Sequence, residues 1–374
     1  MGIYIFNIVL IFMWGTYYAL LKSIKVKHAH FPNLNSSKDK TDKQFISLKS
    51  IFLFLAFFQT YLILCMKNYS IGTDTVSYLS GYRMTMQIDW KEIFNFANDQ
   101  LVFNFERGFI LVTKVITIFT DNFTIYLAIL SALMVIPLFL IIKKYSMMPF
   151  VSLILFVTMG FLNFYLSGLR QGIAISIVVL SFNYIVKRRI LSFVFLVTIA
   201  MLFHKSAMFF YPAYFLLNIN ITPLVGLFYF LFFVIFYVFR FSIIQFISTF
   251  IYSDAQILDT GAYTLFIIVF FTFIIGLLFY KKVISLNNDN KLIYNLIGVA
   301  AGLMILNTVS NTGLRLANYY FIFIIVFIPN IISSFDNKWL RHISTILVVL
   351  FTTSYYFLVG INSNNVLPYK FFWQ

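Results

Sequence analysis

The sequence predicts an all-α protein built as a polytopic bundle of transmembrane helices. Of its 374 residues, 61% are hydrophobic, 21% are aromatic and only 10% are charged, whereas a soluble domain of this length carries many more charged residues. Apolar runs of the length that spans a bilayer, about 20 residues, recur along the chain. We therefore expect one integral membrane domain over residues 1–374, with about twelve spans and a range of eleven to fourteen.

The first two expected spans, 3–21 and 50–66, enclose a basic loop. Residues 22–49 hold seven lysines against two aspartates, and short loops rich in Lys and Arg stay on the cytoplasmic side of a membrane. The N-terminus is then extracytoplasmic. The stretch 1–21 lacks the basic start of a signal peptide, so we expect it to be retained as a span.

The longest polar segment, 67–107, is predicted to be an extracytoplasmic loop that contributes to a site. It holds four basic and five acidic residues, a balance unlike that of the basic cytoplasmic loop. Short interfacial helices are expected at 77–86 and 90–97. The next apolar stretch, 108–120, is too short to cross the bilayer and contains Lys114, so we expect a re-entrant or interfacial segment there.

The rest of the chain is predicted to alternate between spans and short loops. The expected spans are 123–142, 149–166, 171–186, 190–203, 206–217, 222–239, 262–280, 292–309, 316–334 and 343–360. Basic clusters at 143–144, 187–189 and 281–282 close spans on the cytoplasmic side. Residues 241–252 are expected to be interfacial or re-entrant, like those near 75–120. With twelve spans, both termini are extracytoplasmic.

Polar residues from six separate segments fall on the outer side in this topology. They are Asp74, Glu106, Arg170, His204, Arg315 and Tyr369. Several adjoin apolar spans, so we expect the bundle to gather them in one outward-facing cavity. The groups at span ends are mainly cationic, and the planar fork of arginine suits phosphate in particular. A cavity of this kind favours an anionic ligand.

Each candidate also has a purely structural explanation. Asp74 lies just after a glycine, at the third position of Gly72-Thr73-Asp74, and can cap a turn or a helix. Glu106 can pair with the arginine that follows it. His204 can be a hydrogen-bonded residue at a helix end. Arg170 can snorkel to the lipid headgroups, and Lys205 can be an interfacial anchor.

Several classes of function are disfavoured by what the chain lacks. None of its twelve acidic residues lies inside an expected span, whereas ion-coupled carriers need a buried carboxylate. The net charge of +15 lies mostly in short loops, as topology sorting requires, and does not indicate nucleic acid. No HExxH, CxxC, Walker or DxD motif occurs in a fitting context, and Cys65 is the single cysteine. We expect no metal, no nucleotide and no other cofactor.

Six short motifs occur in order along the chain. They are Gly72-Thr73-Asp74 with Tyr78, Phe105-Glu106-Arg107-Gly108-Phe109, Leu169-Arg170-Gln171-Gly172-Ile173-Ala174, Phe203-His204-Lys205-Ser206-Ala207, Gly313-Leu314-Arg315 with Tyr319-Tyr320, and Pro368-Tyr369-Lys370. In this order they resemble the EpsG family of Wzy-like polysaccharide polymerases, and the resemblance covers nearly the whole chain.

The resemblance implies a multi-pass enzyme of the bacterial cytoplasmic (inner) membrane. Such an enzyme is a glycosyltransferase-type polymerase that joins oligosaccharide repeat units, carried on polyprenyl pyrophosphate, into exopolysaccharide or capsule at the outer face. Because the lipid pyrophosphate already activates the donor, neither a sugar nucleotide nor a metal is required. The implied partners are the lipid-linked oligosaccharide, the lipid bilayer, a chain-length regulator and a flippase, and no nucleic acid.

Our hypothesis for the mechanism is a direct displacement with inversion. The hydroxyl of one lipid-linked unit attacks the anomeric carbon of the growing chain, and polyprenyl pyrophosphate leaves. Glu106 or Asp74 is the general base, worth roughly 10²- to 10⁴-fold in rate, and His204 is the alternative base or a phosphate ligand. Arg170 and Arg315 hold the pyrophosphate. The further substrate contacts are Gln171, Lys205, Tyr78, Tyr319 and Tyr369.

Other functions fit part of the same pattern. A flippase or transporter of the same lipid-linked oligosaccharides shares the cationic cavity but needs no general base. A polysaccharide ligase acts on finished polymer, and a membrane acyltransferase that uses His204 decorates the polymer without changing its length. A non-catalytic scaffold in an export complex is disfavoured by the gathering of polar residues on one face.

Overall fold

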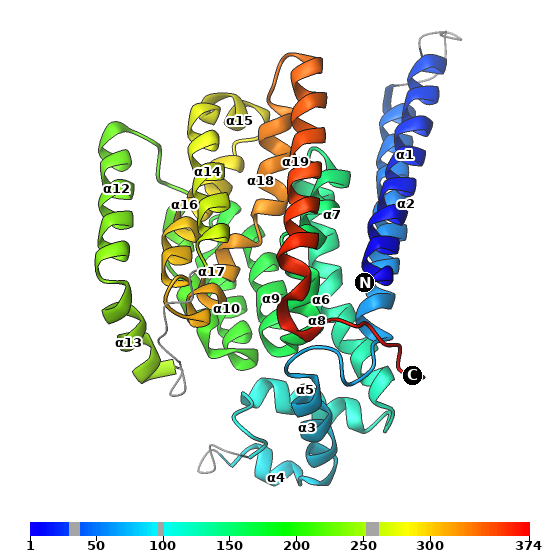
Figure 1. The fold of residues 1–374 in the computed structure, drawn as a ribbon, viewed down its shortest axis with the longest axis vertical. Coiled ribbons are helices and arrows are strands. Elements are labelled where there is room, and N and C mark those ends of the chain that lie inside the picture. Colours follow the sequence, from blue (N-terminus) through cyan, green and yellow to red (C-terminus); the bar gives the residue numbers. More distant parts are fainter. Residues whose placement is uncertain (30–37, 96–100, 252–261) are drawn as a thin grey trace. The chain divides into compact units, whose positions relative to one another are not determined.

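The protein is helical throughout the part of the chain that the structure describes. This computed structural model describes the backbone of residues 1–29, 38–95, 101–251 and 262–374 and the side chains of 1–21, 48–95, 101–249 and 262–374. Over these ranges, β-structure is limited to isolated bridges. The predicted all-α class is confirmed (Figure 1).

The chain folds as two compact units that alternate along the sequence. The first unit comprises Met1–Gln87, Thr113–Leu169 and Thr345–Gln374. The second unit comprises Ile88–Val112 and Arg170–Ser344. The expectation of one integral membrane domain, and of the sides on which 22–49 and 67–107 lie, stays a prediction.

The first unit contains both long and short helices. They are α1 (Gly2–Ala29), α2 (Lys38–Cys65), α3 (Thr75–Gln87), α6 (Phe123–Tyr145), α7 (Pro149–Thr158), α8 (Phe161–Ser167), the second part of α19 (Lys338–Leu358) and the 3-10 helix η2 (Gly360–Asn365). Within this unit, α2 packs against both α1 and α6. The backbone of the basic segment 22–49 is helical over 22–29 and 38–49, because α1 and α2 extend beyond the expected spans.

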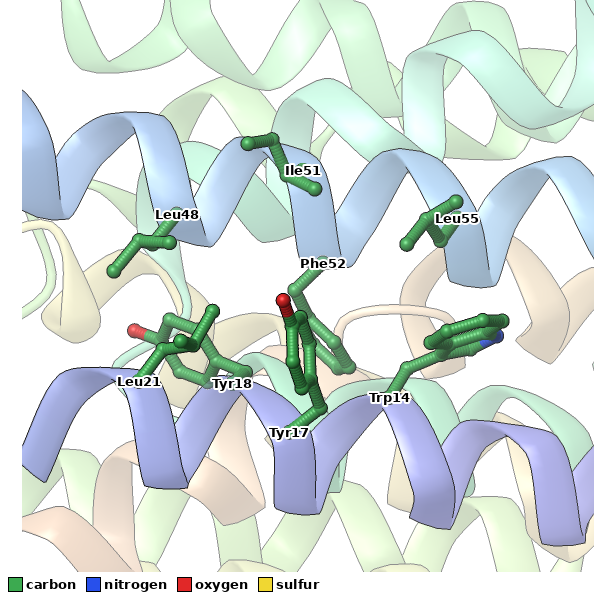
Figure 2. A pocket seen from close by; sticks show the side chains of 8 residues that line it. All are labelled: Trp14, Tyr17, Tyr18, Leu21, Leu48, Ile51, Phe52 and Leu55. Carbon is green, nitrogen blue, oxygen red and sulfur yellow. The ribbon is translucent and has the colours of Figure 1, made fainter. Parts of the chain in front are cut away.

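Aromatic and aliphatic side chains fill much of the contact between α1 and α2. Figure 2 shows a small apolar pocket there, lined by Trp14, Tyr17, Tyr18, Leu21, Leu48, Ile51, Phe52 and Leu55. Beside it, Trp14 Nε1 donates to Gln59 Oε1 at 2.9 Å, and Gln59 Nε2 donates to Asn7 Oδ1 at 2.9 Å. Hydrogen bonds of this kind join helices in an apolar environment, where the hydrophobic effect adds little.

The second unit holds more and shorter helices. They are α4 (Trp90–Ile93), the first part of α5 (Arg107–Thr117), α9 (Leu169–Val186), α10 (Ile190–Phe203), η1 (Lys205–Phe210), α11 (Ala213–Leu216), α12 (Pro223–Val238), α13 (Arg240–Ile251), α14 (Tyr263–Leu278), α15 (Tyr280–Leu286), α16 (Asn290–Leu306), α17 (Asn311–Phe321), α18 (Ile324–Ser333) and the start of α19. Helix α16 is buried along almost its whole length and packs against α12, α14 and α17.

Between four and eight elements are candidates to cross a membrane in the described ranges. Four single helices are long and apolar enough: Gly2–Leu21, Leu48–Cys65, Phe123–Tyr145 and Leu169–Val186. Four further candidates are bent pairs: α7 with α8, α12 with α13, α14 with α15, and α17 with α18, with bends of 50° to 80°. The expected twelve spans are therefore not confirmed.

The expected span at 206–217 is wrong. This stretch forms the 3-10 helix η1 and the four-residue helix α11, separated by a turn at Tyr211 and Pro212. Tyr211 and Pro212 themselves have helical dihedrals. Proline lacks a backbone N–H, however, so Pro212 cannot donate the hydrogen bond that would continue one helix through this run. The preceding helix α10 has 14 residues, which at about 1.5 Å per residue falls short of a bilayer core of about 30 Å.

The short elements expected near 75–120 are present as helices. Helix α3 covers the expected 77–86. Of the expected 90–97, only Trp90–Ile93 is helical, the chain turns at Phe94, and residues 96–97 lie outside the described residues. Helix α5 has 11 residues, too few to cross a bilayer. Helix α13 covers the element expected at 241–252 up to Ile251. It is bent 75° from α12, and the two helices together are one of the bent pairs that are candidates to cross a membrane. Residue 252 lies outside the described residues.

Candidate functional site

The second unit contains an ion pair between Arg170 and Glu106. Arg170 lies in the first turn of α9, and its Nη1 is 2.6 Å from Glu106 Oε2. The same nitrogen donates to the carbonyl oxygen of Asn104 at 3.0 Å. Glu106 Oε1 accepts a hydrogen bond from the backbone N–H of Lys205 at 3.2 Å. Both carboxylate oxygens of Glu106 are therefore engaged, one by a cation and one by a helix start.

Glu106 does not pair with the adjacent Arg107, although its purely structural explanation requires this pair. Arg107 instead donates to the carbonyl oxygens of Glu92, Ile93 and Asn95, at 3.3, 3.1 and 2.9 Å. The carbonyls of Glu92 and Ile93 are the last two of α4, and that of Asn95 lies just beyond the helix. Cationic side chains commonly donate hydrogen bonds to carbonyls at the C-terminal end of a helix. Of the two adjacent charges, one therefore closes a helix and the other belongs to the cluster around Arg170.

Close packing of α5 on α10 brings Glu106 to Lys205. A Cβ atom on Gly108 would lie 2.5 Å from the Cβ of Leu202 and 2.6 Å from its carbonyl oxygen. Only a glycine therefore fits at this point of the motif without displacing backbone. The guanidinium of Arg170 also lies over the ring of Phe105, with 4.5 Å to the ring centroid, a stacking that fixes its plane.

His204 is buried beside this ion pair, with 8% of its surface exposed. Its Nδ1 is hydrogen-bonded to Ser206 Oγ at 2.7 Å, and Ser206 Oγ is hydrogen-bonded to the hydroxyl of Tyr319 at 3.0 Å. Burial first, and then the positive charges of Arg170 and Arg315, hold the pKa of His204 well below its usual value. The imidazole is therefore neutral at neutral pH.

Gln171 connects the ion pair to the helix that carries Arg315. The buried side chain of Gln171 donates from Nε2 to the backbone carbonyl oxygen of Arg315 at 2.5 Å. Arg315 itself is exposed on α17. The hydrogen bond therefore holds α9 and α17 together at the position of the two arginines.

The structure thus gathers seven of the predicted site residues in the second unit. They are Glu106, Arg170, Gln171, His204, Lys205, Arg315 and Tyr319. The other three belong to the first unit. Tyr78 is buried on α3, and Tyr369 donates its hydroxyl to the carbonyl oxygen of Ile63 at 2.7 Å. A role of these tyrosines in binding substrate stays a prediction.

Asp74 precedes α3 in the first unit. Its backbone carbonyl oxygen accepts a hydrogen bond from Tyr78 at 3.0 Å, as the first turn of a helix requires. Its half-buried carboxylate makes no hydrogen bond within the described ranges, so the side chain does not cap α3. The structural explanation for Asp74 therefore does not hold.

Sequence reasoning missed two residues that the geometry singles out. Ser206 links His204 to Tyr319; its signal was a serine two residues after a histidine at the end of an apolar run. Lys67 is 1% exposed in the first unit; its signal was a lone lysine directly after a span. Among the described residues, no three His, Cys, Asp or Glu side chains are grouped as metal ligands.

Fold and site together define a helical membrane protein with a cationic cluster around a neutral histidine and a carboxylate. The profile of the EpsG family matches residues 50–371. The chain therefore belongs to the EpsG family, a family of Wzy-like polysaccharide polymerases. No curated protein and no solved structure matches the chain.

Proposed function

We propose that this protein polymerises oligosaccharide repeat units, carried on polyprenyl pyrophosphate, into surface polysaccharide by glycosyl transfer. Its family supports a polymerase, and such a polymerase implies a lipid-linked oligosaccharide substrate. The observation that carries the proposal is the ion pair of Arg170 with Glu106, whose carboxylate also accepts from the Lys205 N–H next to His204, together with the hydrogen bond from Gln171 to Arg315. The reaction takes place at the outer face of the bacterial cytoplasmic membrane, with both termini extracytoplasmic.

The reaction is a displacement at the anomeric carbon of the growing chain. A hydroxyl oxygen of the incoming unit forms the new C–O bond, and the bond between the anomeric carbon and the pyrophosphate oxygen breaks. The proton of the hydroxyl passes to a base, and polyprenyl pyrophosphate leaves with the electron pair. With one base and one displacement, the configuration at the anomeric carbon inverts.

Arg170 and Arg315 bind the leaving pyrophosphate. Two guanidinium groups offer planar sets of N–H donors that match phosphate oxygens. The negative charge on the bridging oxygen grows as the bond breaks, so these contacts strengthen in the transition state. Losing one such contact typically lowers the rate about 10²- to 10³-fold.

Binding of pyrophosphate and release of Glu106 are coupled in this proposal. Arg170 is partly exposed and now bonds Glu106. A pyrophosphate oxygen competes for the same guanidinium, and Glu106 is then able to accept the proton of the incoming hydroxyl. Asp74 is the alternative base, because its carboxylate makes no hydrogen bond among the described residues.

His204 contributes a neutral imidazole. Ser206 holds Nδ1 and so fixes the orientation of the ring. A neutral imidazole has one N–H donor and one acceptor, so His204 either donates to a phosphate oxygen or takes the proton in place of a carboxylate. Gln171 and Lys205 hold the positions of Arg315 and Glu106 through backbone contacts.

The test is polymer length in cells that lack this protein, read as a gel ladder together with the extracted lipid-linked intermediates. Complementation uses the wild type, Arg170→Ala and Arg240→Ala. Arg240 is a matched control, because it also lies 4.5 Å over an aromatic ring and donates to a carbonyl oxygen. We expect single repeat units to accumulate at the outer face, and only the wild type and Arg240→Ala to restore the ladder.

The other outcomes assign a different function. Units trapped at the inner face indicate a flippase, and finished polymer stranded on lipid indicates a ligase. A polymer of normal length that lacks acyl groups indicates an acyltransferase. An unchanged ladder in the deletion strain contradicts polymerisation.

A further inference from the structure

The first unit contains a lysine that is buried where the chain leaves α2. Lys67 follows this helix by two residues and is 1% exposed. Its Nζ donates to Thr75 Oγ1 at 2.7 Å, to the carbonyl oxygen of Ile71 at 3.3 Å and to the carbonyl oxygen of Leu166. An ammonium has three N–H donors and no acceptor, so these three oxygens use all of them.

The three acceptors tie one turn to one helix end. Ile71 and Thr75 are the two ends of the turn that carries the Gly-Thr-Asp motif, and Leu166 lies in the last turn of α8. The turn is bonded to α8 a second time, because Thr73 uses both its backbone N–H and its hydroxyl on Ser167 Oγ, at 3.0 and 2.5 Å. The turn is thus held at both ends and in its middle.

The backbone of Gly72 lies too close to α8 for any other residue. Its φ is +92°, and a Cβ atom there would lie 2.5 Å from the carbonyl oxygen of Leu166. The C-terminal segment is also hydrogen-bonded to the stretch 68–72. Gly72 N–H donates to Asn365 at 3.0 Å, and Asn68 N–H donates to Lys370 at 2.9 Å.

The residue that this turn presents is Asp74. Its neighbours Thr73 and Thr75 are both bonded to the α8 end, whereas its own carboxylate makes no hydrogen bond in the described part of the chain. A carboxylate that is uncommitted on a rigid support is pre-organised for a ligand. Asp74 also lies close enough for its charge to act on Lys67.

We propose that Lys67 is a positioning residue, which clamps the 71–75 turn to α8 so that the Asp74 carboxylate meets the substrate in one fixed orientation. The proposal rests on the proposed function, since the ligand of Asp74 is a sugar hydroxyl of the lipid-linked unit. Burial lowers the pKa of Lys67 to about 7, against the opposing charge of Asp74. The clamp therefore has one more N–H donor below this pH than above it.

Lys114 supplies a matched control in the same unit. Its Nζ donates to the carbonyl oxygens of Thr85 and Met86, at 3.2 and 3.1 Å, at the end of α3. Lys114 is thus a lysine that also binds backbone carbonyls, but it closes a helix and does not touch the 71–75 turn. Replacing either lysine by methionine keeps most of the side-chain length and removes the donors.

The experiment uses the full chain in lipid nanodiscs and two readouts. Amide hydrogen exchange over 66–75 reports how firmly the turn is held, because the amide of Thr73 donates to Ser167 at the end of α8 and the amide of Gly72 donates to Asn365. Extension of lipid-linked repeat units reports function. We expect Lys67→Met to accelerate hydrogen exchange at these amides. We also expect it to lower kcat about as much as Asp74→Asn does, roughly 10²-fold, and to change KM less than about 2-fold. Lys114→Met is expected to do neither.

The double variant separates positioning from general damage. If Lys67 acts through Asp74, adding Lys67→Met to Asp74→Asn lowers kcat no further, because coupled residues are not additive. Multiplied losses in the double variant overturn the proposal, and so does faster exchange with unchanged kcat. Unchanged exchange in Lys67→Met also overturns it.

Two provisions keep the test decisive. If Lys67→Met does not fold, Ser167→Ala removes the second tie of the same turn without touching the buried charge, and the same non-additivity with Asp74→Asn is required. If the wild type does not extend lipid-linked units at all, the proposed function fails. The exchange readout then still decides whether Lys67 clamps the turn.

Discussion

Arg170 and Lys67 are two cations near two motif carboxylates, but they are built in opposite ways. Arg170 is partly exposed, with 21% of its side chain accessible, and bonds the carboxylate of Glu106 directly. Lys67 is buried, bonds only carbonyl and hydroxyl oxygens, and leaves the carboxylate of Asp74 without a hydrogen bond in the described part of the chain.

This difference indicates that Arg170 is suited to binding a ligand, whereas Lys67 is suited to supporting the local structure. A partly exposed guanidinium can exchange a carboxylate for a phosphate, because water and ligand both reach it. A buried ammonium whose three donors are used cannot change partners without leaving an uncompensated polar group. We therefore expect changes at Arg170 to alter the reaction while the protein stays folded, and changes at Lys67 to alter the local structure first.

The sharpest test of the comparison is Glu106→Gln. The amide cannot pair with Arg170 as a carboxylate does and cannot act as a base, so we expect polymerisation to fall by roughly 10²- to 10⁴-fold. The measurement is the rate of chain extension in vesicles. Glu92→Gln is the matched control, since Glu92 is the other glutamate of the chain and is exposed on α4. A loss of equal size in both variants would contradict a special role of Glu106.

The second test exchanges the two types of cation. Arg170→Lys keeps the charge but loses the fork and the stacking on Phe105, so we expect about 10²- to 10³-fold slower extension from a protein with wild-type thermal stability. Lys67→Arg places a larger group in a closed site, and we expect a lower melting temperature. Both quantities are measured for both variants. The reverse pattern would break the comparison.

A glycine pair tests how tightly the 71–75 turn sits on α8. Gly72 and Gly160 both have positive φ, +92° and +84°, but a Cβ on Gly160 would have nothing within 4 Å. Backbone strain costs about 1–3 kcal/mol at either position, and only Gly72→Ala adds a clash with Leu166. We expect Gly72→Ala to melt at the lower temperature in detergent. Equal melting temperatures would show that the turn does not need this close approach.

The smallest expected effect is a pH dependence of stability. The pKa of Lys67 is about 7 in the folded protein and near its usual 10.5 in the unfolded chain. Between these values the unfolded chain binds one more proton, so the contribution of Lys67 makes stability rise with pH. Melting temperatures at pH 7 and pH 9 measure this slope, which we expect Lys67→Met to reduce. An identical slope in the variant would place the titration elsewhere.

Composition and motif order were enough for the class of protein and for its family. Apolar runs predicted a helical membrane protein, because hydrocarbon demands apolar helices whatever their packing. The motifs around Glu106, Arg170, His204 and Arg315 were recognisable because residue types and their order are read from the sequence without knowing how the helices pack. Seven of the predicted site residues lie together in the second unit, and their roles in binding and catalysis stay predictions.

Only the tertiary structure decided which charged side chains pair with each other and where an apolar run is interrupted. Glu106 pairs with Arg170 rather than with adjacent Arg107, because Gly108 lets α5 approach α10 and Arg107 is used at the end of α4. The run through Pro212 is broken, although its hydropathy resembles that of a span. Lys67 is buried because the turn and α8 offer it three oxygens at once. Sequence spacing carries no such information, since these contacts join segments that are distant along the chain.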